Sequence, residues 1–562
     1  MTEDHGNDSL GSRSELWSLD EGVQVELESG GSLLRVRSRW GDVAIRHPSE
    51  PVRDALYRMR LGPISLENVS GIRNGPFGGA EAPSDTQSPY PPVRIQLEKV
   101  LNRLQPLIIR SLGMETGQPL LSVVPMTPLS RFHAVPVPPD VPVRLSTYAE
   151  LRTNGQEFSL ESPLSLHRVL LHRAEAISLI GPLGRPVTAA GYAAALPQLA
   201  SVAADTLAYL VAAGMVVKAE GTEEAGETQG HDSELPVFAE DTDPALAGWS
   251  GVDLMFHTRR TLGRHDNAFG ATYPRGSGSP EQAVKPRLPG PSIPLHRPRW
   301  EDLAAADPTL AVAMEGRRSM RVYGPEPVTA AELGVLLYRT ARVRSLITPP
   351  LSAESYREPD AAAGARPTAG AAANGNDPRL TDRPYPGGGA CYEIELYVTV
   401  GQCQGIAPAI YHYDPLGHQL ELVNSDRVMV DELLKSASQA AVIDVPPPVL
   451  ITMTARFQRL TWKYEGMAYA VALIDLGVLI QSLYLVCTAM GLAPCALGSV
   501  RIDVPARAFG TDWRLEPTMG QFMLGRFPDS RDAYAGRWEP ANDAHWPDLA
   551  RASLRGSRPA SS

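Results

Sequence analysis

The stretch that decides the fold of the second half of the chain is RPYPGGGACYEIELYVTV, residues 383–400. Its last part places Ile394, Leu396, Val398 and Val400 at every second position, which is the period of a β-strand. Three consecutive glycines precede the strand, and glycine lets backbone N–H groups approach a flat ligand without a clash against Cβ. The stretch predicts a strand entered through a ligand-binding loop, although glycine-rich turns before strands are common.

A β-hairpin and a long apolar element follow this strand in the sequence. Residues 410–413 and 420–423 read as two strands around the turn Asp414–Gly417. LTWKYEGMAY, residues 460–469, then leads into the apolar element. A lysine that enters apolar surroundings can have its pKa lowered toward neutrality. Taken alone, Lys463 and Tyr464 favour a plainer interpretation, a snorkelling lysine and an ordinary core tyrosine.

An arginine-rich segment lies upstream of the glycine loop, in GRRSMRVY, residues 316–323. It separates a helical stretch that ends at Gly316 from a new helix that starts with the capping box Thr329–Glu332. In an extended segment Arg317, Ser319 and Arg321 share one face. Two guanidinium groups and a hydroxyl suit a phosphate. A solvated basic stretch is an equally good interpretation of this motif alone.

The segment Leu476–Val500 contains no charged residue. Such a segment is either a membrane span or a helix in the centre of a large soluble fold. It carries polar residues and three glycines, and nothing else in the chain resembles a membrane protein, so we expect a buried helix. A helix this apolar is also expected to lie at a two-fold interface.

Composition narrows the classes of protein that need to be considered. A chain of 562 residues suggests two to four domains, and 43% hydrophobic and 20% charged residues indicate a folded protein. A net charge of −11 argues against a non-specific nucleic-acid binder. The four cysteines form no CxxC pair and no His lies at zinc-ligand spacing, so we expect no metal site. Few cysteines and an acidic N-terminus unlike a signal peptide predict a cytoplasmic protein with no membrane association.

The N-terminal half contains no catalytic motif. Strands are expected around Val23–Leu27, Leu33–Val36 and Val43–Ile45. Between Ser165 and Lys218, helical spacing at residues 166–171 and 199–211 followed by a short strand is the outline of a winged-helix domain. Because residues 199–211 contain no Lys or Arg, this domain is expected to bind a protein or peptide rather than DNA.

The composition along the chain suggests five segments. They are a strand-rich domain with a possible peptide-binding role (1–160), a winged-helix-like domain (161–219), an acidic linker (220–250), a domain that carries the motifs described above and a flexible insertion at 349–384 (251–540), and a disordered tail (541–562).

The order and spacing of these motifs resemble one family. Arg-Arg-Ser-x-Arg, the proline- and glycine-rich loop before a Glu-Leu-Tyr strand, Lys-Tyr-x-x-x-Ala-Tyr and the late Leu-Gly-Arg occur in sequence. The chain resembles the SagB-type dehydrogenases, flavin enzymes of the nitroreductase superfamily that act in thiazole/oxazole-modified peptide biosynthesis. Met255–Arg259 is similar to the short Phe-His motif that opens their catalytic domain. The resemblance covers about the second half of the chain.

The resemblance implies an α+β fold of the FMN-dependent nitroreductase type, preceded by winged-helix-like α/β domains, and a homodimer with FMN at its interface. It implies that Arg317, Ser319, Arg321 and Arg526 hold the FMN phosphate and ribityl chain, and that Pro386–Gly389 line the flavin ring. The full set of cofactor-binding residues that it implies is Arg317, Arg318, Ser319, Arg321, Pro386, Gly387, Gly388, Gly389, Gln481, Gly498 and Arg526. Lys463 and Tyr464 match the family's catalytic pair.

Two residues depart from the family pattern. Gly387 stands where the family commonly has Ser, which removes one possible hydroxyl contact to the flavin, and Ala470 stands where it often has Arg. The expected activity is oxidation of azolines to azoles in a ribosomally made peptide, with a precursor peptide and a cyclodehydratase as partners. The alternatives are a flavin oxidoreductase for another small natural product or one that uses NAD(P)H, and a non-catalytic scaffold in a peptide-modifying complex. A winged-helix transcription factor is the weakest alternative.

Overall fold

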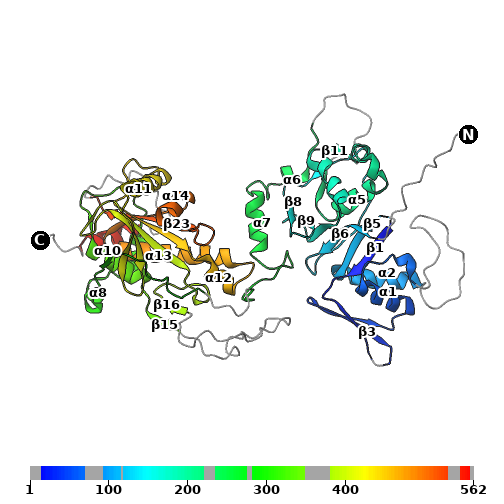
Figure 1. Cartoon of the computed structure of the whole chain (residues 1–562), viewed down its shortest axis with the longest axis horizontal. Coiled ribbons are helices and arrows are strands. Elements are labelled where there is room, and N and C mark those ends of the chain that lie inside the picture. Colours follow the sequence, from blue (N-terminus) through cyan, green and yellow to red (C-terminus); the bar gives the residue numbers. More distant parts are fainter. Residues whose placement is uncertain are drawn as a thin grey trace, which may run out of the picture. The chain divides into compact units, whose positions relative to one another are not determined.

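The computed structural model of the chain describes residues 14–28, 30–69, 93–114, 118–220, 235–274, 281–347, 380–528 and 545–556. These residues form two compact units, one that runs to Asn267 and one that starts at Ala268 (Figure 1). Residues 349–379 of the predicted insertion and residues 221–234 of the predicted linker lie outside the described residues.

The first unit is built around a six-stranded antiparallel sheet in the order β1-β5-β6-β10-β9-β8. Its strands are β1 (Ser14–Leu19), β5 (Ile108–Gly113), β6 (Pro119–Pro125), β8 (Glu150–Thr153), β9 (Phe158–Glu161) and β10 (His167–Leu171). A second sheet contains β2 (Gln24–Leu27), β3 (Leu33–Ser38) and β4 (Gly41–Arg46), which confirms the three strands predicted there. The helices α1 (Glu50–Leu61) and α2 (Val93–Arg103) pack together and contribute to the same core as this second sheet.

The winged-helix outline is right at its end and wrong at its start. The expected strand at the end is present as β12 (Val216–Lys218), after a helix that stops before Gly214 at φ 71. The helix expected at residues 166–171 is instead β10, in which His167, Val169 and Leu171 are buried on one face. Period-two burial in a sheet overrode the apparent helical spacing. The remaining elements are β7 (Pro142–Leu145), α3 (Ala174–Ser178), β11 (Val187–Thr188), α4 (Ala189–Ala194) and α5 (Ala200–Ala212).

Two predicted boundaries need correction around the junction of the units. The far end of the predicted linker is structured, because Phe238 is 1% exposed and α6 (Ala239–Thr242) follows it. The helix α7 (Gly251–Arg259), which was expected to open the catalytic domain, lies in the first unit. An ion pair between Arg259 and Glu161 at 2.9 Å ties α7 to β9.

The second unit is a seven-stranded antiparallel sheet covered by helices, so the predicted α+β fold is confirmed. The strand order is β13-β20-β19-β17-β21-β23-β22. The strands are β13 (Ser292–Pro294), β17 (Ile394–Val400), β19 (Ala409–Asp414), β20 (Gln419–Asn424), β21 (Val449–Ala455), β22 (Leu492–Leu497) and β23 (Thr518–Arg526). The predicted strand after the glycine loop is β17, and the predicted hairpin is β19 with β20.

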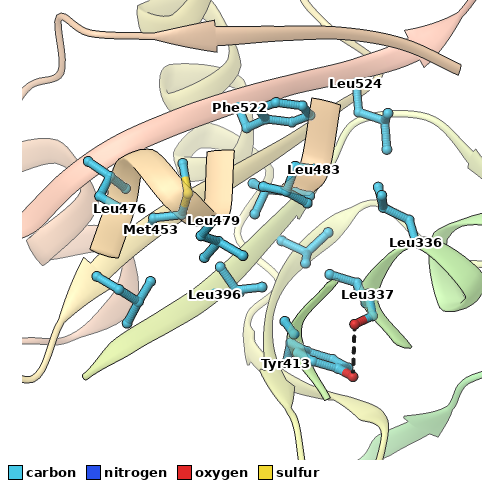
Figure 2. Packing of buried hydrophobic residues seen from close by; sticks show 14 of the residues in the cluster. Leu336, Leu337, Leu396, Tyr413, Met453, Leu476, Leu479, Leu483, Phe522 and Leu524 are labelled. Atoms are coloured by element: carbon cyan, nitrogen blue, oxygen red, sulfur yellow. Dashed lines mark hydrogen bonds between the residues drawn. The ribbon is translucent and has the colours of Figure 1, made fainter. Parts of the chain in front are cut away.

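The long helix α13 (Ala468–Ala489) lies along one face of this sheet. Figure 2 shows Leu476, Leu479 and Leu483 of α13 beside Met453, Leu396 and Phe522 of the strands, and all of these belong to one buried cluster. The helices α11 (Arg427–Ala441) and α14 (Asp503–Phe509) share a second cluster with residues of β17, β19 and β21. The remaining elements are α8 (Trp300–Ala306), α9 (Leu310–Gly316), β14 (Val328–Thr329), α10 (Ala330–Ala341), β15 (Ser345–Ile347), β16 (Leu380–Asp382), β18 (Cys403–Gln404), α12 (Phe457–Lys463) and α15 (Trp546–Gly556).

Three further predictions in this unit are wrong in part. Leu476–Val500 is not one helix, because α13 ends at Ala489 and Gly491, at φ 68, turns the chain into β22. The predicted disordered tail contains α15, which packs on α9. The last residues of the predicted insertion form β16, which pairs with β15.

Among the described residues, α13 is the one helix whose length and apolar character would allow it to cross a membrane. Half of its most apolar window is buried inside the unit. Its remaining surface includes Leu473 and Ile474, which are 39% and 58% exposed.

Candidate active site

The turn between α12 and α13 positions Lys463 and Tyr464. Lys463 is the last residue of α12, and the Tyr464 N–H donates to the Leu460 carbonyl at 2.7 Å before the backbone becomes extended. Gly466 then takes φ 73, and a Cβ on it would lie 2.9 Å from the ring of Phe269. Both candidate catalytic residues are therefore half-buried in a tight turn, four to five residues before α13 begins.

The glycine loop lies against this pair. Gly389 has φ 59, a backbone conformation that favours glycine, and a Cβ there would lie 2.4 Å from the Tyr464 hydroxyl and 2.6 Å from the Lys463 Nζ. Lys463 donates a hydrogen bond of 3.4 Å to the Gly389 carbonyl oxygen. The structure thus brings together two motifs that lie more than 70 residues apart in the sequence.

The backbone after the loop is in an uncommon conformation. Ala390 and Tyr392 have φ 57 and φ 46, although neither is glycine. Such residues cost on the order of 1–3 kcal/mol each and concentrate at functional sites. Tyr392 also explains the glycine at 387, since a Cβ there would lie 3.0 Å from the Tyr392 ring. A serine would have to displace that ring.

A buried carboxyl group holds the loop from α13. Asp475 accepts hydrogen bonds from the Gly388 N–H at 2.8 and 3.1 Å. Glu393, at the end of the loop, is 0% exposed and neighbours Asp475. Sequence reasoning did not assign either residue to the site. The signal available was that Asp475 is the only acidic residue within α13.

The arginine segment lies at the ends of β22 and β23. The Met320 N–H donates to the Pro494 carbonyl at 2.6 Å, and the Gly324 N–H donates to the Arg526 carbonyl at 2.9 Å. The Ser319 hydroxyl lies 2.8 Å from the Tyr484 hydroxyl of α13, and the Arg317 guanidinium lies 5.2 Å from the Tyr484 ring. Tyr484 is thus a further site residue that the sequence did not reveal.

The arginines of this region differ in their charge balance. Neither Arg317 nor Arg321 forms an ion pair with any residue in the described ranges. Arg526 is paired with Glu332 at 2.8 Å, the same glutamate that completes the capping box of α10. The positive charges available to an anion are therefore those of Arg317 and Arg321 rather than that of Arg526.

The other predicted cofactor residues stand apart from these contacts. Gln481 is exposed on α13, and Gly498 is exposed just after β22 with open space around it. Arg318 is half-buried beside Ser319, and Pro386 precedes Gly387 at the start of the loop. No hydrogen bond in the described part of the chain joins Gln481 or Gly498 to the loop or to the arginine segment.

One helix carries contacts to both regions. Asp475 and Tyr484 are nine residues apart on α13, which corresponds to roughly 14 Å along a helix axis. The glycine loop with Lys463 and Tyr464 lies near one position, and the arginine segment near the other. Nine residues are also about two and a half turns, so the two side chains leave α13 on opposite sides and the two regions do not share one face of the helix.

Two family models match the chain. Residues 314–526 match the model of the nitroreductase family, and residues 143–266 match the model of the cyanobactin oxidase ThcOx. The second match ends one residue before the boundary between the two compact units.

Two curated proteins are similar to part of the chain. The nitroreductase homologue MJ1384 of Methanocaldococcus jannaschii is 25% identical over 210 residues, which is 37% of this chain and 86% of that protein. The microcin B17-processing protein McbC of Escherichia coli is 28% identical over 154 residues, which is 26% of this chain and 56% of McbC.

Among solved structures, a nitroreductase-like protein of Ralstonia eutropha JMP134 has a TM-score of 0.31 and 18% identity, over 44% of this chain and 98% of that one. The microcin synthetase McbBCD complex of Escherichia coli, with truncated pro-MccB17 bound, has a TM-score of 0.28 and 18% identity, over 42% and 88% of the two chains. The family assignment rests on the two models and the curated relatives. Because a nitroreductase-family domain follows a segment of the cyanobactin-oxidase type, the chain is an oxidoreductase with a nitroreductase-family domain, and it is similar to the SagB-type dehydrogenases of that superfamily.

Proposed function

We propose that the chain is an FMN-dependent dehydrogenase that oxidises azoline rings of a ribosomally made peptide to thiazoles or oxazoles. The observation that carries this proposal is the convergence of Lys463 and Tyr464 on the glycine loop at Gly389. The similarity to a cyanobactin oxidase and to the microcin B17-processing protein supports a peptide substrate. Because the match covers only 56% of McbC, we propose rather than infer directly that this chain shares its peptide-processing role.

The residues present fit FMN. Arg317 and Arg321 have no ion-pair partner among the described residues and would hold the phosphate, with the Ser319 hydroxyl beside them. The loop Gly387–Gly389 would face the flavin ring, where its small residues leave the backbone accessible. Flavins are typical of the nitroreductase family. Bound FMN would accept the hydride from the azoline and pass the electrons to molecular oxygen.

The chain's own residues then supply positioning and proton transfer. Aromatisation of an azoline removes one proton and one hydride from the ring. We assign proton removal to the Lys463 Nζ, with the Tyr464 hydroxyl assisting, since both atoms lie at the loop where the substrate ring would stack. The half-buried turn that holds them limits access of water to the base.

A homodimer forms part of this proposal. Leu473 and Ile474 lie on the same helix as Asp475, and a partner that covered them would enclose the site. Symmetric association through one shared surface is the common arrangement of homodimers.

We also propose that the first unit binds the precursor peptide and that a cyclodehydratase acts with this enzyme in the cytoplasm. In the first unit β8 is an edge strand, and no described strand pairs with its outer side. The edge of β12 is partly covered, because the Glu220 N–H donates to the Val237 carbonyl. Strand addition at β8 is therefore the favoured mode of peptide binding. Leu151→Pro should weaken binding of the precursor to the full-length protein, whereas Leu151→Ala keeps the N–H group and should not.

The decisive experiment uses purified full-length protein with an azoline-containing peptide. We expect yellow protein that releases FMN on denaturation, and loss of two hydrogens per ring by mass spectrometry without added NADPH. Turnover that requires NADPH and reduces a nitroarene, with no change in the peptide, would instead identify a nitroreductase. Colourless protein that FMN cannot reconstitute would contradict the proposal.

A further inference from the structure

Glu393 and Asp475 form a buried carboxyl pair behind the glycine loop. Glu393 is fully buried, and neither of its oxygens accepts a hydrogen bond from a donor group among the described residues. Asp475 is 5% exposed and already accepts from the Gly388 N–H. Two carboxyl groups can hydrogen-bond to each other only when one of them carries a proton.

The surroundings favour a single proton on Glu393. Burial, together with the negative charge of Asp475, raises the pKa of Glu393 to about 8. Asp475 has its own pKa raised by burial, but its hydrogen bonds from Gly388 and Glu393 oppose that effect. At neutral pH the proton therefore resides on Glu393, and Asp475 carries the charge.

Other ionisable groups near the pair do not remove this preference. Arg383 is 2% exposed and favours ionisation of Glu393, but its effect is smaller than those of burial and Asp475. Tyr385 and Cys391 also interact electrostatically with both carboxyl groups, and Lys463 and Arg459 act in turn on Cys391.

We propose that Glu393 and Asp475 act as one positioning pair for the glycine loop. Glu393 donates its proton in a hydrogen bond to Asp475, and the Asp475 carboxylate holds the Gly388 N–H. When Glu393 ionises, two negative charges face each other in a buried place and the loop is released. The proposal rests on the proposed function for one point only, that this loop lines the flavin ring.

Amide exchange in the full-length protein without added flavin tests the pair directly. Hydrogen exchange of residues 387–391 is measured between pH 6 and 9.5 and corrected for the intrinsic rate. In the wild type, protection should fall about tenfold between pH 8 and 9, because each pH unit above a pKa changes the population ratio tenfold. Glu393→Gln still donates to Asp475 but cannot ionise, so its protection should stay constant within twofold.

The matched control is Glu516→Gln. Glu516 lies in the same unit, and its carboxylate accepts hydrogen bonds from the hydroxyl groups of Tyr397 and Thr454. This variant should reproduce the wild-type profile. Asp475→Asn offers a neutral, weaker acceptor, and its protection should be lower at every pH. The proposal would be overturned if protection in Glu393→Gln fell with pH as it does in the wild type. It would also be overturned if protection in the wild type did not fall between pH 8 and 9.

Flavin affinity provides the second readout. The apparent Kd for FMN, measured by fluorescence quenching, should rise about tenfold between pH 7 and pH 9 in the wild type, because only the protonated form keeps the loop in place. In Glu393→Gln it should change less than twofold. If FMN binds at no pH, the proposed function fails, and the amide-exchange profiles alone test whether Glu393 and Asp475 position the loop. If FMN binds and the exchange profiles of the wild type and of Glu393→Gln are the same, the proposed role of the pair is wrong, whereas the proposed function is unaffected.

Discussion

The side chain of Lys463 points at the glycine loop, with its Nζ 3.4 Å from the carbonyl oxygen of Gly389. Lys463 ends α12, whereas Gly389 lies just before β17. A hydrogen bond of this length is weak, so the Lys463 Nζ can exchange the carbonyl for a substrate atom at little cost. The contact therefore positions the proposed base at the loop without a strong hydrogen bond that the substrate would have to break.

Removal of this base should slow the reaction without releasing the flavin. Positioned acid–base groups typically contribute about 10²–10⁴-fold, so Lys463→Ala should lower turnover by that factor. Tyr464→Phe keeps the ring and should cause a similar or smaller loss. Single-turnover flavin reduction by an azoline peptide is the measurement, with flavin occupancy measured in parallel and the exposed Lys435→Ala as control. Wild-type flavin reduction in Lys463→Ala would make Lys463 a packing residue.

Gly389→Ala should disturb the same pair without changing either residue. The new methyl group would meet both the Tyr464 hydroxyl and the Lys463 Nζ, and alanine at φ 59 adds roughly 1–2 kcal/mol of backbone strain. We expect turnover to fall at least tenfold. Gly248→Ala, where nothing lies within 4 Å of the added methyl group, is the control and should keep full activity. Equal activity in the two variants would show that the contact has no catalytic role.

Flavin retention should depend on Arg317 and Arg321, which have no ion-pair partner among the residues that the structure describes. Hydrogen bonds that involve charged groups contribute about 1.5–3 kcal/mol, so the double change Arg317→Ala and Arg321→Ala should weaken FMN binding at least 100-fold. Equilibrium dialysis measures the change. Arg526→Ala breaks the ion pair with Glu332. It should therefore lower the unfolding temperature of the protein, and its effect on FMN affinity should be smaller than that of the double variant. If Arg526→Ala releases FMN and the double variant retains it, the assignment of the phosphate contacts is wrong.

Assembly should depend on the exposed side of α13. Ile474→Glu places a charge on a surface that is proposed to be buried between two copies, and it should convert a dimer to a monomer in light scattering. Val428→Glu makes the same change at a residue of α11 that is 67% exposed and should leave the dimer intact. A wild-type protein that binds FMN as a monomer would contradict the dimer.

The buried ion network around His412 should give the protein a pH-dependent stability. His412 lies 2.9 Å from Glu395 and 3.3 Å from Glu421. Burial opposes its charged form, but these two hydrogen bonds outweigh burial and raise the pKa of His412. Because the folded state binds the proton more tightly, this stabilisation is complete below about pH 6.5 and is lost as the pH rises through the folded-state pKa.

Urea unfolding of His412→Gln checks this network. Breaking a buried ionic contact costs about 3–5 kcal/mol. The difference in unfolding free energy between wild type and variant should therefore be of that order at pH 6 and should shrink toward pH 9. The exposed His133→Gln serves as control. A difference that grows with pH would mean that His412 is neutral in the folded protein.

The sequence predicted the parts of the site that depend on local patterns. The strand after the glycine loop, the hairpin that follows it and the capping box at Thr329 all come from short-range rules, and each is present. The helix predicted at residues 166–171 failed because burial in a six-stranded sheet decides a short apolar segment, and sheet partners far along the chain cannot be read from it. The resemblance to a known family supplied the roles of Lys463 and Tyr464.

Long-range electrostatic relationships could not be predicted. The sequence gives no sign that Arg526 pairs with Glu332, nearly 200 residues upstream, so its charge seemed available for a phosphate. Glu393 and Asp475 likewise come close together only because the end of the glycine loop packs against α13. Such contacts depend on how distant segments pack, so they cannot be predicted from composition or from the spacing of residues in the sequence.

The left-handed backbone at Ala390 and Tyr392 has a consequence for any attempt to make the protein more heat-resistant. Glycine at position 390 would relieve local strain and is the kind of change that a stability screen tends to find, whereas glycine at position 392 would remove a buried ring from the core. The same relief would loosen the segment that leads from the glycine loop into β17. Selection for thermostability alone should therefore enrich variants at position 390 that have lost activity, a trade-off between stability and activity that follows from the backbone conformation of one residue.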